Sequence, residues 1–230
     1  MAKKAKRSPK KPTGVTGPFS VGPQGITHHP VQFPETKTAI EDMIATLFVG
    51  NAGRMPIALA PFSELISNEE NDLDFSVVCS DGQRRLLELA EFAPLQELHV
   101  SYDDAPRQLG IGDMADLTCA LIEKKSKRQG GPFRLLLLYK THEQFFIAPP
   151  VQELIRRRLS LQAPAFDAVY FLSPHDSEQA TVFEVWPSRA DPFFTNTTDA
   201  LLANLHFVRA YPDEFQRHII DSYVVYKRRT

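Results

Sequence analysis

Three carboxylates, Glu41, Asp74 and Glu88, stand on three separate predicted elements and are the residues best suited to chemistry. Two carboxylates held close together repel each other as anions, so such a pair suits Mg²⁺, which prefers oxygen ligands and retains several waters. A bound Mg²⁺ can polarise a phosphoryl oxygen and lower the pKa of a bound water, which is the chemistry of phosphodiester hydrolysis. The plainer alternative is that acids on a hairpin are simply solvated.

Glu41 lies on a predicted helix that begins after Thr36 and ends at Gly50-Asn51. Its apolar residues recur at the spacing of one helix face, Ile40, Met43, Ile44, Leu47 and Phe48. Glu41 falls at the edge of this stripe, about 90° from its centre. We therefore expect its side chain to point sideways into a neighbouring site.

Asp74 and Glu88 lie on the two strands of a predicted hairpin, residues 73–79 and 86–92, around Ser80-Asp81-Gly82. A two-residue turn at Asp81-Gly82 would send the two carboxylates to opposite faces of the sheet. A three-residue turn with a left-handed Gly82 would instead pair Cys79 with Gln83 and set Asp74 opposite Glu88, with Cα atoms about 5 Å apart. The second turn is favoured because it also groups the apolar residues of both strands on one face.

The remaining elements complete a mixed α/β domain over residues 35–230. A helix over 114–122 is followed by a leucine-rich run, 133–139, which is typical of a central strand covered on both faces. A helix from Val151 to Leu159, strands at 166–172 and 181–186, helices at 198–208 and 213–220, and a strand at 222–226 follow. The order predicts a single mixed sheet with flanking helices.

This order of helix, strand with Asp74, strand with Glu88-Leu89-Ala90, helix and strand resembles the PD-(D/E)XK nuclease-like superfamily, over residues 36–140 with an extension to 186. The resemblance implies a restriction-endonuclease-like fold. It also implies that Asp74 and Glu88 hold Mg²⁺, that Glu41 assists, and that a lysine helps activate the attacking water.

The chain departs from the superfamily pattern at two positions: Ala90 stands where the lysine is expected, and Leu73 replaces the proline before the aspartate. The superfamily is known to relocate this lysine to the following helix, where Lys124 and Lys125 are available, and Lys124 is the candidate. Cations at a helix C-terminus are also favoured by the helix dipole alone. An inactive descendant that acts as a protein or nucleic-acid interaction module is the alternative function.

Basic residues suggest where a nucleic acid would bind. Residues 1–34 are rich in proline and glycine and predict a flexible basic arm, whereas residues 12–230 carry 20 Lys and Arg against 28 Asp and Glu. Such an arm would equally serve as a nuclear-localisation-like segment or a solubility tail. The candidate phosphate-binding residues are Lys3, Lys4, Lys6, Arg7, Arg156, Arg157 and Arg158.

Composition excludes several other classes. No apolar run approaches the ~20 residues of a membrane span, and no secretory signal is expected. Two cysteines, Cys79 and Cys119, fit a cytoplasmic or other reducing intracellular compartment and exclude a disulfide or zinc scaffold. The glycines and histidines match no nucleotide-binding, zinc-protease or serine-hydrolase motif.

Overall fold

A six-stranded mixed sheet forms the centre of the molecule in the computed structural model, which describes residues 15–23, 25–54, 57–68, 74–101, 104, 109–128 and 133–205. The sheet order is β3 (Ser63–Ser67), β4 (Phe75–Val78), β5 (Arg84–Glu91), β6 (Arg134–Tyr139), β7 (Ala168–Pro174) and β8 (Ala180–Trp186). The pairs β3–β4, β4–β5 and β7–β8 are antiparallel, while β5, β6 and β7 run parallel. The expected single mixed sheet is confirmed.

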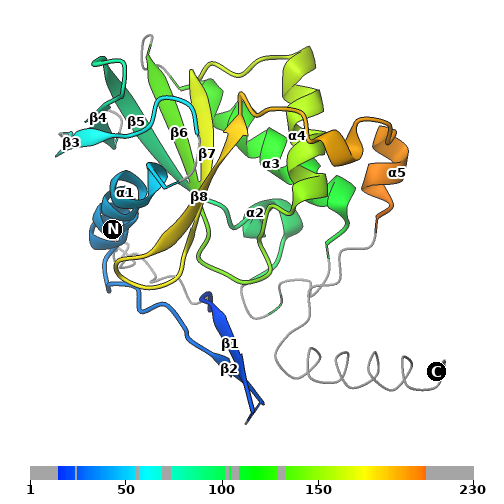
Figure 1. The fold of residues 1–230 in the computed structure, drawn as a ribbon, viewed down its shortest axis with the longest axis horizontal. Helices are drawn as coiled ribbons and strands as arrows, with labels where there is room; N and C mark the ends of the chain where they lie inside the picture. The colour runs from blue at the N-terminus through cyan, green and yellow to red at the C-terminus, as the bar shows by residue number, and fades with distance from the viewer. Residues whose placement is uncertain are drawn as a thin grey trace, which may run out of the picture.

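Helices cover both faces of this sheet (Figure 1). Helix α1 (Lys37–Ala52) packs on one face. The other face is covered by α3 (Ile111–Ser126) and α4 (Pro149–Leu161), with the short helices α2 (Leu95–Leu98), η1 (Pro192–Phe194) and α5 (Asp199–Ala203) beside them. The leucine-rich strand β6 is buried along its length between the two layers, as its sequence predicts, and its first residue, Arg134, is buried as well.

Strand alternation decides which layer each residue of β5 meets. Leu87 and Leu89 belong to the hydrophobic core beneath α1, and Ala90 belongs to the core beneath α3 and α4. Because side chains alternate along a strand, Glu88 points to the α3 side of the sheet. The two faces of β5 therefore pack against different helices, one against α1 and the other against α3 and α4.

The turn between β4 and β5 is the three-residue turn expected from the sequence. The Cys79 amide donates to the Gln83 carbonyl (2.9 Å), and Gly82 has φ 77°. Phe75 pairs with Leu87, so the same register continued by one residue sets Asp74 opposite Glu88. Leu73 lies outside the described residues.

The N-terminal region differs from the flexible arm expected over residues 1–34. Residues 1–14 lie outside the described part, but β1 (Phe19–Gly22) and β2 (Gly25–His28) form an antiparallel hairpin. The buried Thr16 hydroxyl donates to Glu143 (2.7 Å), and Val31 and Phe33 join the core beneath α1. The high proline and glycine content favoured a flexible arm, although two apolar residues in this segment, Val31 and Phe33, are buried in the core.

The C-terminal elements are only partly described. The helix expected at 198–208 appears as α5, residues 199–203, and the helix at 213–220 and strand at 222–226 lie outside the described residues. Within the described ranges, none of the helices combines the length and apolar character needed to traverse a lipid bilayer.

Phe33→Ala is expected to lower the free energy of unfolding by about 3 kcal/mol, because the ring fills the core beneath α1. The measurement is urea-induced unfolding followed by circular dichroism. Phe193→Ala is the matched control, because 83% of that side chain is exposed and its loss should change stability by under about 0.5 kcal/mol. Equal effects of the two substitutions would contradict the ordered N-terminal segment.

Gly82→Ala is expected to destabilise the protein by about 1 kcal/mol, because a Cβ at positive φ is strained even where space is open. Gly50→Ala should have the opposite sign and stabilise by about 0.5 to 1 kcal/mol, since Gly50 lies in α1 with no atom within 4 Å of an added Cβ. Differential scanning calorimetry would show both shifts, and a stabilising Gly82→Ala would disprove the left-handed turn.

Candidate active site

A fully buried carboxylate, Glu88, marks the candidate site on the face of β5 that α3 covers. Its Oε1 atom lies 2.8 Å from Nζ of Lys125 and 2.9 Å from Nη1 of Arg128. Its Oε2 atom has no hydrogen-bond partner among the described residues. An ionised carboxylate removed from water is costly unless it is paired, so these two cations are what allow Glu88 to stay at this depth.

Lys125 reaches Glu88 from the last turn of α3. The helix buries Met114, Thr118 and Ile122 against the sheet, and Lys125 continues that stripe at the same i, i+3, i+4 spacing. Only 14% of its side chain is exposed, and Nζ also lies 3.2 Å from the Leu89 carbonyl oxygen. The lysine thus contacts two consecutive residues of β5, the first through its side chain and the second through its backbone carbonyl.

Asp74 approaches β5 from the neighbouring strand. It directly precedes β4, and its Oδ2 atom accepts a hydrogen bond from the Leu89 amide at 2.7 Å. The structure therefore brings Asp74 to the same short segment of β5 that carries Glu88. Leu89 is held from both sides, by Asp74 at its amide and by Lys125 at its carbonyl.

Glu41 and Lys124 do not contact this cluster. Glu41 forms an ion pair with Lys37 one turn earlier on α1 (3.1 Å), and α1 packs on the face of the sheet opposite to Glu88. The helical wheel correctly excluded Glu41 from the centre of the buried stripe, but strand alternation separates it from Glu88. Lys124 points away from the stripe that Lys125 continues and lies 3.6 Å from Glu97.

The oxygen atoms at this site fit a magnesium ion with few protein ligands. Glu88 Oε2 is a buried oxygen that no described residue contacts by a hydrogen bond, and Asp74 supplies a second carboxylate from the start of the adjacent strand. Mg²⁺ is commonly held by one or two carboxylates together with waters and substrate phosphates. In the described part of the chain no three His, Cys, Asp or Glu side chains are arranged to hold a metal ion, so the expected convergence of three acids is not seen.

Arg156, Arg157 and Arg158, expected to bind nucleic acid, are engaged within the protein. Glu153, buried on α4, accepts hydrogen bonds from Arg156 (2.6 and 2.8 Å) and Arg157 (2.7 Å). Arg157 also donates to the Thr197 and Phe194 carbonyl oxygens and to Asp199, which ties α4 to η1 and α5. Arg158 pairs with Asp116 on α3 at 2.9 Å.

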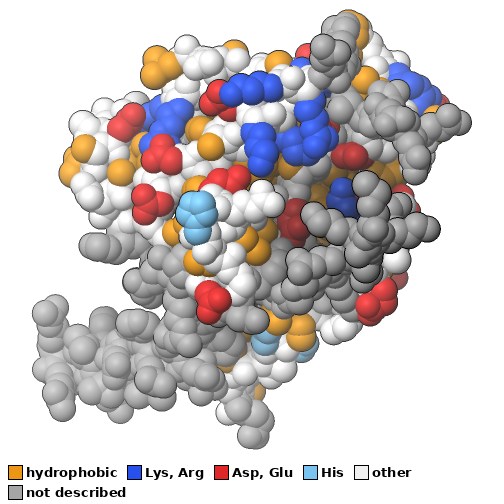
Figure 2. Space-filling view, turned by 180° about the vertical axis from the view of Figure 1, so that it is seen from behind, with side chains coloured by type: hydrophobic (Ala, Val, Ile, Leu, Met, Phe, Trp, Pro, Cys, Tyr) orange, Lys and Arg blue, Asp and Glu red, His pale blue; other side chains and the backbone are white. Residues whose placement is uncertain are grey.

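Exposed cations instead occur at the C-terminal end of α3. Lys124, Lys127 and Arg128 are all exposed there, whereas the predicted phosphate-binding residues Lys3, Lys4, Lys6 and Arg7 lie outside the described residues. Figure 2 shows Lys and Arg side chains gathered in the upper middle of one face, with acidic side chains close by. The face thus offers cations for phosphates without a broad positive field.

Sequence reasoning identified Glu88 and Asp74 and missed Arg128. Lys125 was recognised as available, and the signal that distinguishes it from Lys124 was present in the stripe of α3. Arg128 follows the helix end, so no periodicity predicts where its side chain lies.

Comparison of the chain with protein-family models, with curated proteins and with solved structures gave no match.

Glu153 predicts a specific dependence of stability on pH. Hydrogen bonds from Arg156 lower the pKa of Glu153 from 4.5 to about 2, with Arg157 contributing and burial opposing. Because the folded-state pKa is the lower one, this contribution is present above about pH 4.5 and is lost as the pH falls towards 2. Glu153→Gln should therefore be less stable than the wild type at pH 6, and the difference should vanish near pH 2. Urea unfolding across this range would measure it, and a constant difference would contradict the pairing.

Proposed function

We propose that this protein binds nucleic acid and hydrolyses its phosphodiester bonds with the help of a divalent cation, as a PD-(D/E)XK-like nuclease. The observation that carries the proposal is the contact of Lys125 Nζ with Glu88 Oε1 at 2.8 Å and with the Leu89 carbonyl oxygen at 3.2 Å. A lysine from α3 therefore lies beside the Glu88 carboxylate, although position 90 on β5, where the nuclease pattern has its lysine, is Ala90.

The order of elements supports the same proposal. Helix α1 is followed by the antiparallel strands β3, β4 and β5, and α3 then connects β5 to the parallel strand β6. This is the order on which the resemblance rests, with Asp74 at the start of β4 and Glu88 in the middle of β5. Two more strands, β7 and β8, extend the sheet beyond that unit.

Each residue then has a role that follows from its position. Asp74 and Glu88 would hold the Mg²⁺ ion, which would polarise a phosphoryl oxygen and lower the pKa of a water molecule. The Lys125 ammonium, already among oxygen atoms, would orient the attacking water and offset charge that develops on the phosphate. Arg128 is more exposed than Lys125 and would contact the phosphate from the solvent side. Its ion pair with Glu88 would then open.

A second candidate, an interaction module without catalysis, is favoured by one feature of the site. Glu88 is paired with the two cations Lys125 and Arg128, and Asp74 brings a second carboxylate to the Leu89 amide, so the charges of the cluster balance as it stands. Such a balanced cluster needs no metal to remain folded. The two functions differ in whether a divalent cation binds at Glu88.

The test is cleavage of plasmid and single-stranded DNA and RNA in the presence of Mg²⁺ or Mn²⁺. Glu88→Gln and Lys125→Met should each lower the cleavage rate by at least about 100-fold, because the first removes a metal ligand and the second removes the ammonium group that orients the attacking water. Lys124→Met is the matched control on the same helix turn, since Lys124 contacts Glu97 instead, and it should retain wild-type activity.

Thermal melting separates the remaining outcomes. Mg²⁺ should raise the melting temperature of the wild type and not that of Glu88→Gln, because a ligand that binds only the folded state stabilises it. Cleavage that persists in Glu88→Gln would remove this site from the reaction. No cleavage together with no metal-dependent rise would favour the interaction module.

A further inference from the structure

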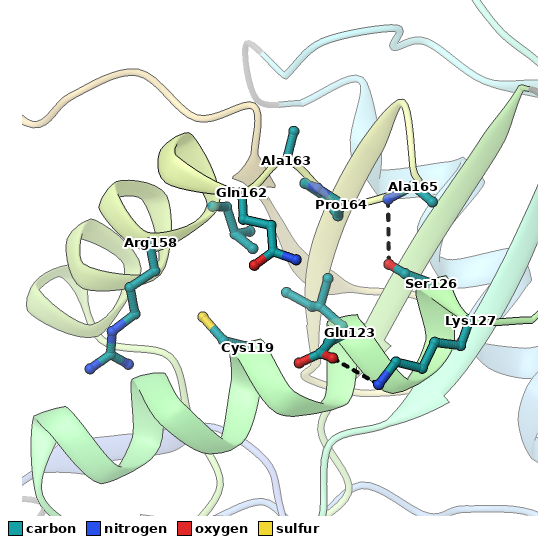
Figure 3. Close-up of a pocket in the computed structure, with 11 residues that line it drawn as sticks. Cys119, Glu123, Ser126, Lys127, Arg158, Gln162, Ala163, Pro164 and Ala165 are labelled. Atoms are coloured by element: carbon teal, nitrogen blue, oxygen red, sulfur yellow. Dashed lines mark hydrogen bonds and ion pairs between the residues drawn. The ribbon is translucent and has the colours of Figure 1, made fainter.

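A pocket of about 360 Å³ opens between the C-terminal ends of α3 and α4, apart from the Glu88 cluster (Figure 3). Ile122 and Leu159 form apolar walls from the two helices, and residues 163–165 close a third side. The Ala165 amide donates to the Ser126 hydroxyl at 3.4 Å, which fastens this segment to α3. The volume lies within the range of small-molecule sites, at the end that suits one nucleotide.

Polar groups of complementary kinds surround this apolar interior. The Gln162 side chain points into the pocket and offers both a donor and an acceptor (Figure 3). Glu123 lies at the rim 2.7 Å from Lys127, and this lysine lowers the pKa of Glu123, which keeps the carboxylate ionised. Arg158 also lines the pocket, and its guanidinium is paired with Asp116 at 2.9 Å.

These groups match a nucleobase with an exocyclic amino group. A carboxylate accepts from the amino group of cytosine, whereas the carbonyl oxygen at the same position of uracil has no proton to donate. Apolar walls and an amide are the means by which an unstacked base is held and its edge is recognised. Lys127, beside Glu123, is placed to neutralise a phosphate attached to that nucleotide.

We propose that the pocket binds one unstacked, amino-bearing nucleotide of a single-stranded nucleic acid, with Glu123 and Gln162 on the base and Lys127 on the phosphate. The choice of a nucleic acid as ligand rests on the proposed function. The last turn of α3 serves both places, because Glu123, Ser126 and Lys127 line the pocket while Lys125 and Arg128 meet Glu88. A strand bound at Glu88 is therefore positioned to leave one base in the pocket.

Cys119 provides a direct measurement, because it lines the pocket and is partly exposed, whereas Cys79 is buried. Burial raises the pKa of the Cys119 thiol, so labelling with a maleimide is followed near pH 8.5 in the metal-free full-length protein. Cytidine 5′-monophosphate should slow labelling in a saturable manner, and uridine 5′-monophosphate should bind about tenfold more weakly. Ribose 5-phosphate should give little protection.

Glu123→Gln should abolish the preference for cytidine over uridine. Glu97→Gln is the matched control, because Glu97 pairs with Lys124 of α3, and this variant should keep the preference. Equal protection by all three compounds, or no protection at millimolar concentration, would overturn the proposal. Because these measurements need neither metal nor cleavage, their failure would leave the proposed nuclease function intact. If the wild-type protein cleaves no nucleic acid but still binds cytidine 5′-monophosphate in preference to uridine 5′-monophosphate, the nuclease function is rejected and the nucleotide pocket is supported.

Discussion

Burial of the Glu88 carboxylate is the constraint on which the candidate site depends. A strand residue between two hydrophobic layers is ordinarily apolar, as Leu87 and Leu89 are on either side of it. Placing a charge there requires compensation from within the protein, and the end of α3 supplies it through Lys125 and Arg128. The ion pairs therefore fix where the last turn of α3 lies along β5. They also fix the position of the pocket, because its residues lie on the same turn.

The same burial explains why the acids of the chain do not all gather in one place. A sheet covered by helices on both faces separates its residues into two chemical environments, and neighbouring positions on a strand belong to different ones. Glu88 faces α3, and Glu41 belongs to a helix on the other face. Asp74 falls on the side of Glu88 because the register of β4 and β5 sets the two opposite each other, and its carboxylate accepts from the Leu89 amide. Strand alternation and register together therefore decide which acids of the chain can meet at this site.

Periodicity predicted the elements of this fold well, because both helices and strands are defined by local spacing. The stripe from Ile40 to Phe48, the apolar run of β6 and the left-handed Gly82 each carried their own signal. Contacts between distant residues carried none: nothing near Thr16 predicts that its hydroxyl would bind Glu143. Similarly, three successive arginines suggested a phosphate-binding face, and only the fold showed that acceptors within the protein engage them. Glu153 and carbonyl oxygens near α5 accept from the first two, and Asp116 pairs with the third.

Ala90 connects the departure from the nuclease pattern with the geometry of α3. Residue 90 projects from the same face of β5 as Glu88, so a lysine there would enter the space beneath α3 that Lys125 now occupies. Two ammonium groups beside one carboxylate would repel each other, and the second would lack an acceptor at that depth. A small side chain at position 90 and a lysine at position 125 are therefore parts of one arrangement.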